Sequence, residues 1–228
     1  MAFRSYFGSG NRTGLGVVAF ALALGFASGA GAATLTFSLT TEFSGGTTPA
    51  GTPPFVTASF DDSVGGPNDV RLTMTNGNLV GSENVDLWFF NFDPALDPTL
   101  LTFTVVNNAD SVPNGINTGV DAFMADGDGS YDIQFDFPPP PGSNAALFTA
   151  GEQVTYDITY TGPIDVSSFD FFSVPGGGNG TFLSAAHVQR IGPLADGSGW
   201  IGAVPEPSTA ALFCAGLLGL AAMGRRSR

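Results

Sequence analysis

The residues best suited to bind a ligand lie in one short run, Asp126-Gly127-Asp128-Gly129-Ser130-Tyr131-Asp132. Its oxygen-bearing side chains occupy alternate positions, as they do in calcium loops that gather several oxygens around one hard cation. The run differs from an EF-hand, because Tyr131 stands where that loop has glycine and Phe137 where it has glutamate. Two interpretations stay open. The run is a hairpin turn rich in aspartate and glycine, or it is a different Ca²⁺ loop with the ligands Asp126, Asp128, Ser130 and Asp132.

A second possible chemistry is sugar binding or cleavage. Hydrolysis of a glycosidic bond needs only two carboxylates that flank it, and Glu42, Glu83 and Glu152 could supply them. Trp88 and Trp200 could stack on a sugar ring. No spacing selects one pair of glutamates, so a carbohydrate-binding module and a carboxylate-pair glycosidase both remain alternatives.

Other catalytic chemistries lack their residues. The chain has no lysine for a Schiff base and no Gly-x-Ser-x-Gly motif, and its single histidine is His187. The single cysteine, Cys214, lies in the apolar C-terminal stretch, so a zinc site rich in cysteine or histidine is not available. We therefore expect no enzyme activity, and we expect His187 to be a hydrogen-bonded structural residue.

The segments that must position these residues are strands. Apolar and polar residues alternate over residues 34–40, 70–75, 101–105, 131–137 and 154–160, which is typical of half-buried strands. Residues 85–92 and 169–174 are bulky on both faces and suit strands that are covered on two sides. Turn-forming clusters separate them, among them residues 107–119 and a surface loop at 175–180. The pattern predicts an all-β domain, an antiparallel β-sandwich or jelly roll.

The charge of this domain limits its partners. Residues 33–203 hold nineteen acidic residues and only two basic ones, Arg71 and Arg190, which gives a formal charge of −17. Such a surface repels phosphate backbones, so nucleic acid is excluded as a partner. Cations are favoured partners, although excess acidic residues also serve solubility.

The N-terminus predicts export. Arg4 and Arg12 precede an apolar run at residues 15–26, and small residues with an Ala30-x-Ala32 site follow. These are the parts of a secretory signal peptide, which we place at residues 1–32 with signal peptidase as its partner.

Residues 204–228 have three parts: Pro-Glu-Pro, an uncharged apolar stretch at 208–224, and a basic end made by Arg225, Arg226 and Arg228. The apolar stretch reaches the lower limit of about 17 residues for a transmembrane helix. Positive residues stay on the cytoplasmic side of a membrane, so the domain would lie outside.

This tail resembles the PEP-CTERM sorting signal of exported bacterial proteins, also called the ice-binding protein C-terminal motif. The resemblance implies recognition of Pro205, Glu206 and Pro207 by a membrane protease of the exosortase type. It also implies that the protein is anchored first and then reaches the cell surface or the extracellular matrix. We therefore expect a structural or adhesive role in contact with exopolysaccharide.

Overall fold

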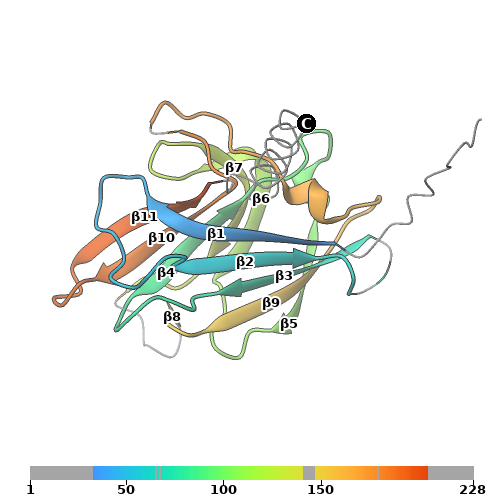
Figure 1. Ribbon diagram of the computed structural model, residues 1–228. Coiled ribbons are helices and arrows are strands. Elements are labelled where there is room, and N and C mark those ends of the chain that lie inside the picture. Colours follow the sequence, from blue (N-terminus) through green and yellow to red (C-terminus); the bar gives the residue numbers. More distant parts are fainter. Residues whose placement is uncertain (1–32, 65, 67, 141–146, 179, 205–228) are drawn as a thin grey trace, which may run out of the picture. The chain divides into compact units, whose positions relative to one another are not determined.

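The computed structural model describes residues 33–64, 66, 68–140, 147–178 and 180–204. They form β-strands and two short 3₁₀ helices (Figure 1). The strands are β1 (Thr34–Glu42), β2 (Val56–Asp61), β3 (Asp69–Thr75), β4 (Asn84–Phe90), β5 (Thr102–Asn107), β6 (Gly115–Met124), β7 (Ser130–Asp136), β8 (Phe148–Thr149), β9 (Gln153–Thr159), β10 (Ser184–Ile191) and β11 (Gly197–Ala203). The helices are η1 (Pro98–Leu100) and η2 (Val166–Phe169). The predicted signal peptide, sorting motif, apolar stretch and basic end lie outside the described residues.

All strands belong to one antiparallel sheet. Its order is β5-β9-β3-β2-β1-β11-β10-β4-β7-β6, and β8 pairs with β4. The sheet is continuous because β1 pairs with β2 up to Leu39 and with β11 from Leu39 to Glu42, with an irregularity between Leu39 and Thr41. The two ends of the sheet approach each other, since the ring of Phe103 on β5 lies 5.6 Å from that of Phe135 on β7. The prediction of an all-β antiparallel domain is confirmed.

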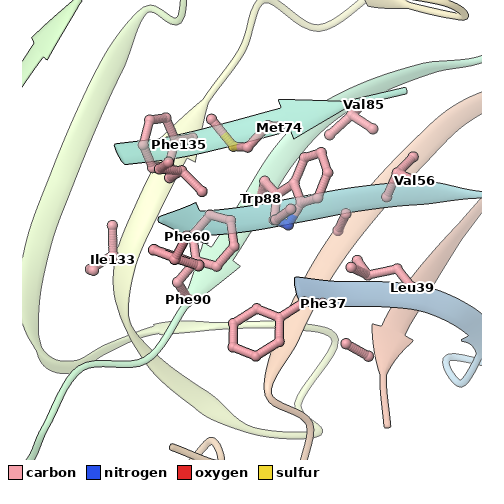
Figure 2. Close-up of a cluster of buried hydrophobic side chains, with 14 of the residues drawn as sticks. Phe37, Leu39, Val56, Phe60, Met74, Val85, Trp88, Phe90, Ile133 and Phe135 are labelled. Atoms are coloured by element: carbon pink, nitrogen blue, oxygen red, sulfur yellow. The ribbon is translucent and has the colours of Figure 1, made fainter. Parts of the chain in front are cut away.

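The inward face of this nearly closed sheet carries an aromatic core. Figure 2 shows side chains of β1, β2, β3, β4 and β7 converging on Trp88, which is fully buried. Phe60 and Phe90 meet edge to face at 5.4 Å, a geometry that aromatic rings prefer. A smaller cluster around Phe89 and Tyr131 is separate from this core. Strand β4 contributes residues to both clusters, which explains why it carries bulky residues on both faces.

The five strands predicted from alternation are present as β1, β3, β5, β7 and β9, and β4 covers most of residues 85–92. The strand predicted at residues 169–174 is wrong. Asp165 accepts a hydrogen bond from the Ser167 N–H and forms a capping box with Ser168, which starts helix η2. The helix ends at Phe169. Only an isolated bridge between Val174 and Ser130 follows. Within the described residues, no helix has the length and hydrophobicity that crossing a bilayer needs.

Candidate functional site

The aspartate- and glycine-rich run forms the hairpin turn between β6 and β7. Asp126 and Gly127 have φ angles of 49° and 79°, and the Asp128 N–H donates to the Ala125 carbonyl at 2.8 Å. Positive φ at both central residues is what a two-residue type I′ turn needs, because it matches the twist of the flanking strands. The run therefore forms the turn of a β-hairpin.

The surface loop at residues 175–178 packs on this turn. A Cβ atom on Gly176 would lie 2.4 Å from the Gly127 carbonyl oxygen, and one on Gly178 would lie 1.3 Å from Asp128 Oδ1. Both positions therefore require glycine, since real Cβ contacts are never that short. Asp128 is 2 % exposed under this cover.

Of the predicted calcium ligands, Asp132 uses both carboxylate oxygens to accept backbone hydrogen bonds. Asp132 Oδ2 accepts from the Phe92 N–H at 2.9 Å, and Oδ1 accepts from the Asp121 N–H at 2.8 Å. In the part of the chain that the structure describes, no three His, Cys, Asp or Glu side chains are grouped closely enough to hold a metal ion. Calcium binding by Asp126, Asp128, Ser130 and Asp132 stays a prediction, to be tested by calorimetry with Ca²⁺.

Asp132 instead lies in the wall of a cavity of about 130 Å³. The cavity lies where β4 ends, and it is bordered by β6, β7 and residues 171–174. Burial raises the pKa of the Asp132 carboxyl, and the negative charge of Asp121 adds to the effect, while the two backbone hydrogen bonds lower it. The carboxylate is thus held in a place that disfavours its negative charge.

Asp121 reaches the cavity through a bulge in β6. Thr118 pairs with Ile133 and Phe123 pairs with Tyr131, so residues 119–122 lie opposite Asp132 alone. Asp121 has a φ of 49°, a left-handed conformation that is uncommon outside glycine. Bulges of this kind often redirect side chains beside binding sites.

Sequence reasoning missed the pairing of Asp121 with Asp132. Met124 pairs with Ser130 and Phe123 with Tyr131, so a regular hairpin would place Asp121 opposite Ile133. The bulge at residues 119–122 brings Asp121 beside Asp132, and no local pattern predicts that bulge. The aromatic walls of the cavity come from distant segments, and no local pattern indicates them.

The three glutamates that could serve a glycosidase each hold a turn. Glu42 Oε1 accepts from the Ser44 and Gly46 N–H groups at 2.8 and 3.1 Å. Glu83 accepts from the Ala50 and Val80 N–H groups, and Glu152 accepts from the Thr149 N–H. Their carboxylates satisfy backbone donors, which is a structural task.

The two tryptophans differ. Trp88 has no exposed surface, and its indole N–H donates to Ser184 Oγ at 2.9 Å, so the assignment of Trp88 as a sugar contact needs correction. Trp200 is half-buried on β11 and stacks on the His187 ring at 4.9 Å. It stays a predicted contact residue.

His187 is hydrogen-bonded, as expected. Its Nδ1 lies 2.8 Å from Asp86 Oδ1, and Gln189 Nε2 donates to the other oxygen of the same carboxylate. The partner, Asp86, lies at the irregularity in the pairing of β4 with β10 and was not anticipated from the sequence.

Comparison with known proteins finds a match at the C-terminal tail. Residues 203–227 match the family model described as the PEP-CTERM protein-sorting motif. Searches of curated proteins and of solved structures found no significant match to the chain. The described part of the chain is thus an all-β domain, and the chain carries a PEP-CTERM sorting motif, which indicates export and processing by an exosortase-type protease.

Proposed function

We propose that this protein is a structural or adhesive component of the bacterial surface or extracellular matrix, in contact with exopolysaccharide. The observation that carries the proposal is the sorting motif, which directly follows a folded all-β domain. Strand β11 ends at Ala203 and the Pro-Glu-Pro tripeptide begins at Pro205. The sorting motif would therefore direct this all-β domain to its destination.

The route we propose has three steps. Signal peptidase removes residues 1–32, the apolar stretch at 208–224 holds the exported chain in the membrane, and an exosortase-type protease then acts at Pro205, Glu206 and Pro207. Arg225, Arg226 and Arg228 stay on the cytoplasmic side.

The domain itself supports a binding or structural role over catalysis. Its glutamates serve backbone turns, and its histidine is paired with Asp86. We further propose that the continuous sheet is a β-sandwich of the jelly-roll type, since its inner face encloses one aromatic core. A carbohydrate-binding role is the second candidate, and the cavity beside Asp132 favours it.

Cell fractionation tests the proposal. We expect the full chain to pass from the membrane to the cell surface or matrix with a loss of mass, and a chain truncated after Val204 to be released without anchoring. A variant with Glu206→Ala should accumulate in the membrane at the larger mass, whereas Ser208→Ala should be processed normally. If the full and truncated chains accumulate in the same place with the same mass, the sorting proposal is wrong.

A further inference from the structure

The cavity beside Asp132 combines apolar walls with carboxylates. Phe92 and Phe171 line it, and so does Phe172, which is 50 % exposed. Val120 and Val174 are also exposed beside it. Exposed apolar side chains that gather at one cavity mark binding surfaces more often than scattered ones do.

The carboxylates of the cavity have acceptor capacity left. Each oxygen of Asp132 accepts one backbone N–H, and a carboxylate offers about four acceptor positions. Asp121 is exposed beside it. No basic residue is among the described residues that line the cavity, and Arg71 is paired at 2.7 Å with Asp157 elsewhere. The negative charge therefore has no counterion within the cavity wall.

We propose that this cavity binds the protonated amino group of an amino sugar, with Asp132 and Asp121 holding the ammonium and Phe172 lying against the sugar ring. The inference rests on the proposed contact with polysaccharide and names the kind of sugar that makes it.

The size and walls of the cavity favour an amine over a metal ion. At about 130 Å³ the cavity has room for roughly four water molecules, which suits an ammonium group and the ring carbon that carries it. Calcium takes six to eight oxygen ligands, whereas phenylalanine rings and prolines form much of this wall. An ammonium group also gains from contact with an aromatic face.

The charge of the domain favours an amino sugar over other sugars. Anionic polysaccharides are repelled by a domain with nineteen acidic residues and two arginines. A neutral sugar offers hydroxyl groups but leaves the repulsion between Asp121 and Asp132 uncompensated. A lysine side chain brings the same ammonium, but it lacks a ring that could cover the apolar surface of Phe172 and Val174.

Calorimetry on the full chain in detergent micelles tests this assignment at physiological salt. The probes are a glucosamine oligomer with free amino groups, the N-acetylated oligomer of equal length, and trilysine, at a pH where the amines are protonated. We expect the free-amine oligomer to bind at least about tenfold more tightly than the acetylated one, because acetylation removes the charge. Equal binding of the two oligomers, or tighter binding of trilysine, would overturn the proposal.

Variants locate the binding. Asp132→Asn should weaken it by about tenfold or more, and Asp121→Asn by a few-fold because that carboxylate is exposed. Phe172→Ala breaks no hydrogen bond of Asp132 and should also weaken binding, which covers the case that Asp132→Asn does not fold. Asp196→Asn removes the same charge outside the cavity and should leave the affinity unchanged.

An equal loss in the three aspartate variants, with no loss in Phe172→Ala, would mean general charge attraction and overturn the site. Fractionation separates this inference from the proposed function. A protein that binds free amines through these residues but never reaches the surface would refute the proposed function and keep the cavity assignment. A protein that reaches the surface but shows no preference for free amines would keep the proposed function and refute the cavity assignment.

Discussion

The hydroxyl of Tyr156 is an unusual polar atom in this core. Tyr156 is 1 % exposed, and its hydroxyl has no hydrogen-bond partner among the described residues. The buried indole of Trp88, in contrast, donates to Ser184, which donates to the Phe89 carbonyl. A buried hydroxyl without a partner lowers stability, because folding removes its hydrogen bonds to water.

Replacing Tyr156 with phenylalanine should therefore not destabilise the protein. We expect Tyr156→Phe to raise the free energy of unfolding by up to about 1 kcal/mol, since it deletes the unsatisfied group and keeps the ring. Denaturant unfolding measures it. A loss of more than about 1 kcal/mol would show that the hydroxyl has a stabilising partner.

The pH dependence gives an independent check on the same side chain. Burial raises the pKa of Tyr156 to about 12, while an unfolded tyrosine titrates near 10. The unfolded chain thus loses this proton first, so the stability linked to Tyr156 is complete below pH 10 and declines as the pH rises to about 12. Tyr156→Phe should show a smaller alkaline decline than the parent.

At the scale of elements, the contact between the β6–β7 turn and the loop at residues 175–178 depends on glycine. We expect Gly178→Ala to cost about 1–3 kcal/mol, because its Cβ would overlap the Asp128 carboxylate and force the loop away. Thermal unfolding measures the loss. Gly162→Ala is the matched control, since its nearest neighbour would lie at 3.6 Å; equal melting temperatures for both variants would contradict the packing.

Most of the strands that sequence patterns predicted alternate apolar and polar residues, such as β3 and β9, and β4 was predicted from bulky residues on both faces. Strand β6 was missed because it is an edge strand with a mostly exposed surface, and its start was taken for a turn. Strand β11 was missed because its sequence is rich in glycine. Gly199 and Gly202 are needed there, since a Cβ would lie 2.4 Å from the Thr47 carbonyl and 2.5 Å from the Phe182 ring.

The candidate site could be predicted only in part. The turn at Asp126-Gly127 is a local feature that its two residue types determine. The cavity is not local, because Phe92, Asp121 and Phe172 meet only after three separate segments have packed. Such long-range packing leaves no periodic signal in the sequence.

For the whole molecule, the excess of acidic residues should make stability depend on salt. Nineteen carboxylates and two arginines repel one another on balance, and folding brings them closer together. Raising NaCl from 10 to 300 mM shortens the range of this repulsion, so we expect the melting temperature to rise by about 2–4 °C.

Asp170 and Asp196 are exposed and provide the control for this effect. A variant with both changed to asparagine should show a smaller salt-dependent rise. A melting temperature that falls with salt would mean that ion pairs, such as the half-exposed pair of Arg71 with Asp157, outweigh the repulsion.

The place of β11 in the sheet has a consequence for the order of events during export. The last strand of the domain lies between β1 and β10 and joins two groups of strands that are otherwise separate in the hydrogen-bonded order. If export follows the proposed route, the sheet cannot become continuous before residues 197–203 have crossed the membrane. On the route proposed above, we therefore expect the exported chain to complete its sheet only just before the Pro-Glu-Pro tripeptide, which begins at Pro205, arrives.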